Sequence, residues 1–348
     1  MMYMKVPRSQ GEKTRCELIQ KGIFVAGYPI LGEEGFVLFP VSGPYGGFET
    51  VEREAEKRPI HHDRLKDALS GILTEPELET LIGSFDIIGD IAIIEIPDAL
   101  ESKEKEIGEA LLSVHKNLKT VLKKLGPMEG EFRVRRVKPI AGEDRTTTLY
   151  RESGVLMELD VASVYFSVRL SHERKRISEL VKPGERILAL FAGVGPFPLV
   201  ISKTHPDAEI VAIELNPYAV GFMEKNIARN RAKNVKAVLG DARKVVLSGY
   251  QNFADRILMP LPKGAHEFLD VAYAGARDGG MVHFYTFVGM QDPFREALEK
   301  AESAAKASNV RIEVASQRIV RPYSPQTVQV VLDLIIRKTK VPIQSPSA

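Results

Sequence analysis

Strand-like and helix-like segments alternate from about residue 182 to residue 340, and this alternation limits the fold more than any other feature of the chain. Stretches between the apolar runs predict helices near 197–204, from Pro217 to Arg229, after Lys263 and near 293–307. A chain of this kind forms an α/β domain with a mostly parallel sheet covered by helices on both faces. The runs expected to be strands are RILALF, EIVAIEL, VKAVLG, DRILMPL, GMVHFYTF, RIEVASQRIV and TVQVVLDLIIRK.

The last two of these seven runs have no helix between them, so we expect the sheet to close with a C-terminal antiparallel hairpin. A closing hairpin is typical of the class I methyltransferase version of the Rossmann-like sheet. It separates that version from a nicotinamide dehydrogenase domain, whose strands continue in parallel.

Two smaller α+β domains are expected before this sheet, with boundaries at 1–64, 75–180 and 181–340. The run FDIIGDIAIIEIP predicts a strand pair that turns at Gly89 and Asp90. In the segment after it, 101–126, apolar residues recur at steps of three and four and predict one long helix that Gly126 ends. The buried face of that helix would consist of Ile107, Leu111, Val114, Leu118, Val121 and Leu125.

The composition is that of a globular protein without membrane spans. Of the 348 residues, 44% are hydrophobic and 27% are charged, which excludes disordered and fibrous classes. No apolar run approaches the roughly 20 residues of a membrane helix. Cys16 is the single cysteine, so an internal disulfide framework is excluded and a cytoplasmic location is expected.

The net charge of +2 does not by itself indicate a nucleic-acid partner, but basic residues cluster locally. The clusters are RVRRVKP at 133–139 and RLSHERKRI at 169–177, and both precede the predicted sheet domain. Each cluster taken alone is equally compatible with a solvated surface.

A glycine turn, FAGVGPFP at 191–198, follows the first predicted strand of the sheet. Gly193 and Gly195 let a ligand approach the main chain at the start of a helix. The dinucleotide fingerprint has a third glycine where this chain has Pro198. The turn therefore argues against NAD.

Acidic residues follow the next two strands. Glu214 lies at the end of IVAIEL, where such sheets place an acid that binds ribose hydroxyls, and Asp241 follows the third strand, where it can accept a hydrogen bond from an adenine amino group. Together with the broken fingerprint, the two acids favour S-adenosylmethionine. Both residues could instead serve only as caps of the following helices.

Several motifs taken together resemble one family. They are DVASVYFSVRLSHERKRI, LFAGVGPF, AIELNP, ILMPLPKGAHEFL, GMVHFYTF and IVRPYSP, and the likeness runs from about residue 80 to the end of the chain. They resemble the archaeal and eukaryotic tRNA guanine-N1 methyltransferases that modify guanosine 37 beside the anticodon. The N-terminal module resembles the small accessory domain of the archaeal members.

The resemblance implies S-adenosylmethionine as cofactor and tRNA as partner; the protein is expected to be a monomer. It implies that residues 1–64 recognise the outer corner of the tRNA and that the other two domains hold the anticodon stem and loop. It assigns Glu173 as general base and Arg133 as the arginine that stabilises O6 of guanine, with Pro260 and Pro262 in the loop beside the reacting atoms. The expected cofactor-binding residues are Phe191, Gly193, Val194, Gly195, Glu214, Leu215, Asp241, Ala242 and Pro260. The expected substrate-binding residues are Tyr165, Arg169, His172, Arg174, Arg135, Arg145 and Lys263.

A carboxylate suits this chemistry because N1 of guanine carries a proton that must leave as the methyl group arrives. Other readings of the same residues stay open: Glu173 could form a helical salt bridge with Arg169 or Arg176, and Arg133 could bind a phosphate. No metal site is expected, and the pair His61 and His62 is interpreted as a surface loop.

The chain departs from the family pattern at two positions. Pro260 stands where the family has an asparagine, and Ala189 stands where an acid is usual. Because proline has no side-chain donor, a related reaction stays an alternative: the wybutosine-pathway transfer of an aminocarboxypropyl group, or methylation of the tricyclic base as well as guanosine. A catalytically silent RNA-binding protein is a further alternative, and a nicotinamide oxidoreductase is disfavoured.

Overall fold

The computed structural model of the protein describes residues 1–25, 28–33, 35–55, 65–324 and 326–338. The chain forms two compact units, residues 1–71 and residues 72–348. His61 and His62, which the sequence predicted to lie in a surface loop, fall outside the described residues.

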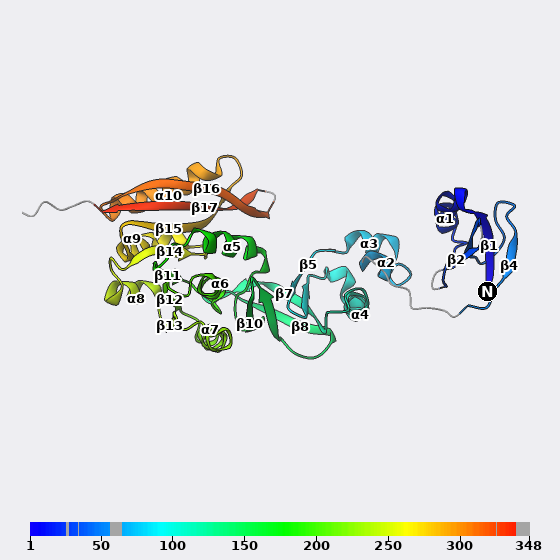
Figure 1. Cartoon of the computed structure of the whole chain (residues 1–348), viewed down its shortest axis with the longest axis horizontal. Coiled ribbons are helices and arrows are strands. Elements are labelled where there is room, and N and C mark those ends of the chain that lie inside the picture. Colours follow the sequence, from blue (N-terminus) through cyan, green and yellow to red (C-terminus); the bar gives the residue numbers. More distant parts are fainter. Residues whose placement is uncertain (26–27, 34, 56–64, 325, 339–348) are drawn as a thin grey trace, which may run out of the picture. The chain divides into compact units, whose positions relative to one another are not determined.

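The first unit is a small α+β module (Figure 1). Its antiparallel sheet has the strand order β2-β3-β1-β4, and Leu18 of α1 packs on Met4 and Phe39 of the sheet. The α+β character expected here is confirmed for the described residues. The elements are β1 (Met2–Pro7), η1 (Arg8–Gln10), α1 (Gly11–Gln20), β2 (Leu31–Glu33), β3 (Phe36–Pro40), β4 (Thr50–Glu52) and α2 (Leu65–Leu69).

The second unit begins with a four-stranded sheet of order β5-β6-β7-β8, against which α4 packs. β5 and β6 pair antiparallel on either side of Gly89 and Asp90, as the sequence predicted. The elements are α3 (Glu75–Thr80), β5 (Phe85–Ile88), β6 (Ile91–Ile94), η2 (Asp98–Lys103), α4 (Glu104–Val114), β7 (Thr120–Glu129) and β8 (Val134–Gly142).

The prediction of one helix up to Gly126 is wrong in its second half. The helix α4 ends at Val114, and residues 120–129 form β7, which pairs with β6 and β8. Thr120, Val121 and Leu122 are buried in succession, as in a strand covered on both faces, whereas Leu125 is 43% exposed. A spacing of three and four between apolar residues does not by itself distinguish a buried helix from a buried strand. Here β6 and β8 provide hydrogen-bond partners for the main chain, and the segment forms a strand.

A hairpin of β9 (Thr147–Glu152) and β10 (Val155–Asp160) connects this sheet to the C-terminal part of the unit. Two asparagines of α7 (Pro217–Asn230) bind its edge: Asn226 Oδ1 accepts from Glu158 N at 2.7 Å, and Asn230 Oδ1 accepts from Leu156 N at 2.9 Å. Because the edge of β10 is fixed in this way, the chain leaves it on a defined path into η3 (Val168–Leu170) and α5 (Ser171–Leu180).

The C-terminal part contains the predicted seven-stranded sheet, in the order β13-β12-β11-β14-β15-β17-β16. Pairs from β13 to β15 are parallel, and β17 pairs antiparallel with both β15 and β16. The doubly wound sheet and its closing hairpin are therefore confirmed (Figure 1). The elements are β11 (Arg186–Leu190), α6 (Pro196–Thr204), β12 (Glu209–Glu214), β13 (Val235–Leu239), α8 (Ala242–Gly249), β14 (Ala254–Met259), η4 (Ala265–Phe268), α9 (Leu269–Gly275), β15 (Ala276–Gly289), α10 (Pro293–Ala307), β16 (Val310–Ser324) and β17 (Thr327–Lys338).

Helices cover both faces of this sheet. Val211 and Ile213 of β12 pack in the cluster that contains α8, α9 and α10, while Ile210 and Ala212 pack in the cluster that contains α5, α6 and α7. This alternation follows from the period of two along a strand. None of the described helices combines the length and apolar character needed to cross a bilayer.

Candidate active site

A cavity of about 1450 Å³ lies at the carboxyl ends of β11, β12, β13 and β14. Doubly wound sheets bind their ligands at this edge. The volume exceeds the roughly 300–1,000 Å³ of a typical small-molecule pocket, so it accommodates a second group beside one bound small molecule. The residues at and just after the ends of the four strands that line it include Phe191, Gly193, Glu214, Leu215, Asn216, Gly240, Asp241, Ala242, Leu261, Pro262, Lys263 and Gly264.

The glycine turn takes a conformation that side chains disfavour. Gly193 and Gly195 have φ angles of +56° and +88°, and Gly195 is the N-cap of α6. A Cβ atom on Gly195 would also lie 3.1 Å from Cγ of Met223. The turn therefore leaves the main chain of Gly193 open toward the cavity.

The carboxylate of Glu214 is fixed by main-chain donors. Its Oε2 accepts from Gly193 N at 2.8 Å, and its Oε1 accepts from Leu215 N at 2.9 Å and Asn216 N at 2.8 Å. Three N–H donors hold one carboxylate in a single orientation beside the glycine turn. This arrangement leaves a lone pair of Oε2 available for a ligand hydroxyl.

Asp241 occupies the matching position one strand further along the sheet. Its Oδ1 caps α8 by accepting from Lys244 N at 2.9 Å, so the capping function considered for this residue is present. The residue also lines the cavity, and capping employs only one of its two oxygens. The ring of Phe191 meets that of Phe268 edge-on at 5.0 Å on the same side of the sheet.

These residues fit the expected S-adenosylmethionine. Two carboxylates at the ends of neighbouring strands match the hydroxyl and amino donors of an adenosine, and the open glycine turn admits a ligand against the main chain. Of the predicted cofactor residues, Val194, Gly195 and Pro260 are not among those that line the cavity. Val194 is fully buried in an apolar cluster with Ala219, so its side chain serves the core rather than a ligand.

Arg133 lies at the cavity, where β8 begins, with a φ angle of +51°. Its Nη2 donates to the carbonyl oxygen of Lys263 at 2.5 Å, which joins two segments 130 residues apart. Burial lowers the pKa of Arg133, and Tyr165 and Tyr323 act in the opposite direction. A guanidinium remains charged under these conditions, so the cavity contains a fixed cation.

Glu173 lies in the first turn of α5 with only 3% of its surface exposed, and it is not among the residues that line the cavity. Its Oε2 accepts from Arg176 Nε and from the Tyr285 hydroxyl, both at 2.9 Å. Its Oε1 lies 3.4 Å from Nε of Arg318. The helical salt bridge to Arg176 that the sequence left open is thus present.

Strand register shows how far Glu173 is from the cavity. Residues of β15, β17 and β16 that are paired across the sheet form rows of neighbouring side chains. Successive residues of a strand point to opposite faces, and the residues between these rows pack with α10. Three rows therefore lie on the sheet face toward α5. We call them the back row, the middle row and the front row. The back row is His283, Asp333 and Ser316; the middle row is Tyr285, Val331 and Arg318; the front row is Phe287, Gln329 and Arg321.

Phe287 and Arg321 of the front row line the cavity, whereas Glu173 contacts Tyr285 and Arg318 of the middle row. Neighbouring rows are two residues apart along β15 and β17, about 7 Å; in β16 a register shift between Ile319 and Arg321 makes Arg318 and Arg321 three residues apart. Glu173 therefore lies one row behind the cavity wall.

The back row forms a buried polar network with α5. His283 is fully buried; its Nε2 lies 2.7 Å from Arg256 Nη1 and its Nδ1 lies 2.6 Å from Asp333 Oδ1. Since arginine only donates, His283 accepts at Nε2 and donates from Nδ1. Burial lowers the pKa of His283 despite Asp333, which keeps the ring neutral. Arg176 joins the network by donating to Asp333 Oδ2 at 2.6 Å.

The predicted substrate-binding residues divide into two groups. Tyr165, Arg169, Arg135 and Lys263 line the cavity. Arg174 does not: it is 1% exposed, and its Nε and Nη2 each donate to Glu152 at 2.6 Å, so its guanidinium contacts the protein rather than the cavity. Its Nη1 donates to the carbonyl of Ser167, which fixes the loop that carries Tyr165.

Arg145 and His172 also lie away from the cavity. Arg145 pairs with both carboxylate oxygens of Asp90, at 3.0 and 2.6 Å, beside a separate hollow of about 800 Å³. Its guanidinium bonds Asp90 in the turn between β5 and β6 and does not line the cavity described above. His172 is exposed on the first turn of α5.

Sequence reasoning missed the contribution of β15 and of the C-terminal hairpin formed by β16 and β17. Phe287, Arg321 and Tyr323 line the cavity, and the rings of Phe287 and Tyr323 lie 4.2 Å apart. The motif IVRPYSP, which contains Arg321 and Tyr323, was the available signal. The motif alone did not indicate a role in the site. Its residues lie at the cavity only because β17 pairs with β15 in the sheet, and that strand order is not visible in the motif.

Comparison with known families gives three matches along the chain. Residues 148–313 match the TRM5/TYW2 methyltransferase domain, residues 65–146 match the TYW2 N-terminal domain, and residues 4–49 match the tRNA methyltransferase 5 N-terminal domain.

Individual relatives are similar over nearly the whole chain. The tRNA (guanine(37)-N(1))-methyltransferase Trm5b of Pyrococcus abyssi is 43% identical over 335 residues, 95% of this chain and 98% of the relative. The crystal structure of Pyrococcus abyssi Trm5b aligns with a TM-score of 0.74 at 41% identity, covering 97% of this chain and 99% of that one. A complex of aTrm5 with tRNALeu aligns with a TM-score of 0.74 at 32% identity, covering 96% and 99%.

Proposed function

The chain belongs to the TRM5/TYW2 methyltransferase family, and from this premise we propose that it methylates N1 of guanosine 37 in tRNA, with S-adenosylmethionine as methyl donor. The observation that carries the proposal is the 43% identity to a tRNA (guanine(37)-N(1))-methyltransferase across 95% of the chain. The cavity supports this proposal, since it is lined by Glu214 and Asp241, which suit an adenosine, and by the fixed guanidinium of Arg133.

Glu214 and Asp241 hold the adenosine part of the cofactor in this proposal, and the glycine turn at Gly193 admits it against the main chain. When bound there, the cofactor supplies an electrophilic methyl group on a sulfonium. The protein's task is then to place N1 of the guanine in line with that methyl group and to remove its proton.

Glu173 is the proposed general base. Its carboxylate takes the N1 proton as the N1–methyl bond forms, a contribution of roughly 100- to 10,000-fold. Support comes from its burial, from the hydrogen bonds of Arg176 and Tyr285 that orient the carboxylate, and from its position one row behind the cavity wall. The function requires the carboxylate to advance toward the cavity in the complex with tRNA.

Arg133 is the proposed electrostatic partner of O6, where negative charge develops as N1 loses its proton. A preorganised donor of this kind contributes about 3 kcal/mol to the transition state. The hydrogen bond from Arg133 to the Lys263 carbonyl holds the guanidinium between the start of β8 and the loop that contains Leu261 and Pro262. Pro262 of that loop is bonded to β15, since its carbonyl accepts from Phe287 N at 3.2 Å.

The tRNA is the proposed macromolecular partner. Guanosine 37 must leave the loop stack to reach the cavity, where Tyr165 can stack on the base while Arg169 and Arg135 bind phosphates. We extend the proposal to residues 1–64 as the part that recognises the outer corner of the tRNA, and to a protein that acts as a monomer.

The experiment that tests the function uses labelled S-adenosylmethionine and tRNA transcripts with guanosine or adenosine at position 37, followed by nucleoside analysis. We expect N1-methylguanosine from the first transcript and no product from the second. Glu173→Gln should reduce the single-turnover rate by about 100-fold or more with unchanged cofactor affinity. Glu179→Gln, an exposed glutamate of the same helix, serves as the control. A wild-type rate from Glu173→Gln would remove the base assignment.

A second candidate function is favoured by Pro260 and by the match of residues 65–146 to the TYW2 N-terminal domain. It is transfer of the aminocarboxypropyl group to the wybutosine precursor, or methylation of that precursor in addition to guanosine. Mass spectrometry of the modified nucleoside distinguishes a single methyl group from the larger substituent.

A further inference from the structure

Gln329 carries a buried donor that the protein itself does not satisfy. The residue is fully buried, and its Oε1 accepts from Arg321 Nε at 2.9 Å. Since arginine cannot accept, this bond identifies the other amide atom as Nε2. Within the described part of the chain, Nε2 has no hydrogen-bond partner. A buried donor without an acceptor costs free energy. We therefore expect Nε2 to have an acceptor when substrate is present.

The place of Gln329 indicates what that partner is. It lies in the middle of the front row, between Phe287 and Arg321, both of which line the cavity. Glu173 lies over the adjacent middle row, on the same sheet face and in the same buried layer. A carboxylate already inside this layer reaches the amide without passing through solvent.

The resting contacts of Glu173 are unequal. Oε2 has two close donors, Arg176 and Tyr285, whereas Oε1 has Arg318 at 3.4 Å, and the side chain of Arg318 is 46% exposed. An exposed arginine on a strand that leads to the cavity is available to a phosphate of incoming RNA. When Arg318 turns to a phosphate, Oε1 requires a new donor.

We propose that Gln329 is a positioning residue whose Nε2 donates to the carboxylate of Glu173 when tRNA is bound, and that this bond holds the base one row closer to the reacting guanine. The proposal rests on the proposed function of Glu173. The distance between rows is about 7 Å. Glutamate and glutamine each carry the polar group on three rotatable bonds, so changes of rotamer on both sides can close that distance.

The charges permit this movement. Arg176 keeps its bonds to both oxygens of Asp333 when Glu173 leaves, at 2.6 and 3.3 Å, so its guanidinium is not left unpaired. The hydroxyl of Tyr285 loses its acceptor when Glu173 moves toward the cavity. Because this loss costs free energy, bound substrate must stabilise the advanced position of Glu173. The N1–H donor of guanine, facing the advanced carboxylate, supplies part of that stabilisation.

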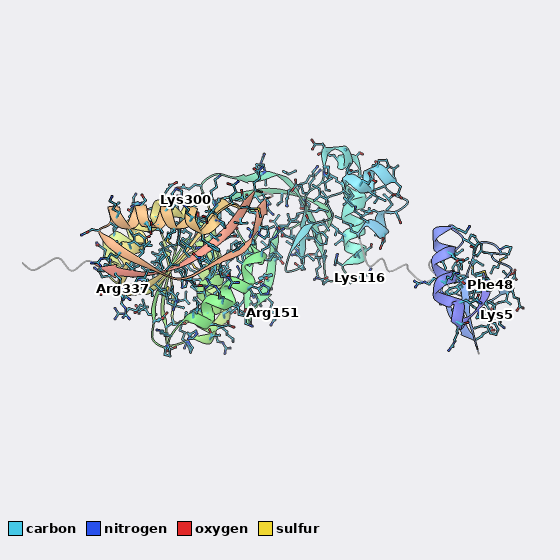
Figure 2. The ribbon with its side chains drawn as sticks, turned by 90° about the horizontal axis from the view of Figure 1, so that it is seen from above. Lys5, Phe48, Lys116, Arg151, Lys300 and Arg337 are labelled. Atoms are coloured by element: carbon cyan, nitrogen blue, oxygen red, sulfur yellow. The ribbon has the colours of Figure 1, made fainter. Side chains whose placement is uncertain are left out.

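Two substitutions separate the donor from the rest of the side chain. Gln329→Glu keeps an oxygen for Arg321 and replaces Nε2 by an acceptor, whereas Gln329→Met removes both groups with little change in volume. The measurement is the single-turnover rate of methyl transfer at saturating tRNA and S-adenosylmethionine, with the dissociation constants of both ligands and the unfolding temperature. Arg337→Gln is the matched control: this arginine is 48% exposed and pairs with Glu313 on the same hairpin, at the opposite end of β17 from Thr327 (Figure 2).

We expect both Gln329 variants to slow methyl transfer by about 10- to 100-fold, the effect of one hydrogen bond to a charged group, with tRNA and cofactor affinities unchanged and with Arg337→Gln at the wild-type rate. A wild-type rate from Gln329→Glu overturns the proposal, because only the Arg321 contact would then matter. A wild-type rate from Gln329→Met overturns it as well, and this variant decides the question if Gln329→Glu does not fold.

The proposed function fails separately from this inference. If Glu173→Gln retains the wild-type rate, Glu173 is not the base and the inference has no foundation. If Glu173→Gln is slow while either Gln329 variant is fast, the base assignment stands and only the positioning role of Gln329 is lost.

Discussion

Asp333→Asn is the substitution whose effect on stability follows most directly from the structure. Burial alone would raise the pKa of Asp333, but His283 and Arg176 outweigh it and lower the pKa from 3.8 to about 2. The side chain is 4% exposed, so solvent screens these interactions little. The change neutralises the acid to which Arg176 and His283 are bonded.

The magnitude can be worked from the pKa. A shift from 3.8 to about 2 corresponds to about 2 kcal/mol of stability, which is present at pH 7. Breaking a buried ion pair from one side costs about 3–5 kcal/mol because a charge is left without its partner. We therefore expect Asp333→Asn to lower the free energy of unfolding by about 2–5 kcal/mol at pH 7.

The pH dependence has a definite sign. The folded-state pKa of Asp333 lies below its unfolded value, so its contribution is complete above pH 3.8 and is lost as the pH falls toward 2. About half of it should remain at pH 3. The difference between wild type and Asp333→Asn should shrink accordingly.

Urea unfolding followed by far-UV circular dichroism at pH 7 and pH 3 measures this difference. Glu313→Gln is the control, since Glu313 forms an exposed pair with Arg337 on the same hairpin, and its urea midpoint should match that of the wild type. A destabilisation below about 1 kcal/mol at pH 7, or one that is equally large at pH 3, would refute the assignment of a stabilising charge to Asp333.

Two predictions concern the reaction. Glu214→Gln should weaken S-adenosylmethionine binding by about 10- to 100-fold in calorimetry, because an amide nitrogen would face the N–H groups of Gly193, Leu215 or Asn216; an unchanged cofactor affinity would contradict the assignment. Arg133→Ala should lower the single-turnover rate by about 100-fold with cofactor affinity retained, and a loss confined to tRNA affinity would instead assign Arg133 to phosphate binding.

The sequence predicted the sheet domain well because period-two and helical patterns are local properties. The alternation from residue 182 gave the seven strands, and the missing helix before TVQVVLDLIIRK gave the closing hairpin. The pattern failed at 115–126, where apolar spacing fits a helix and a strand equally and the sheet partners β6 and β8 decided the outcome.

The candidate site was predictable where a motif follows directly on a strand. Glu214 and Asp241 end up at the cavity because the carboxyl ends of parallel strands meet at one edge. For the arginines the sequence could not distinguish functions: Arg169 lines the cavity, while Arg174 is buried on Glu152. In the sequence, the basic residues of one cluster have the same properties, and only the tertiary packing decides which of them line the cavity and which are buried in ion pairs.

The sequence by itself determined the order of strands and helices in the C-terminal sheet domain, the glycine turn and the acids that follow it, because each depends on residues close along the chain. Only the tertiary structure decided which distant residues meet. It placed Glu173 over Tyr285 and Arg318, one row behind Phe287 and Arg321, and it left the amide nitrogen of Gln329 buried without an acceptor. The physical reason is that sheet order and register, which no local pattern encodes, decide which side chains share a buried layer.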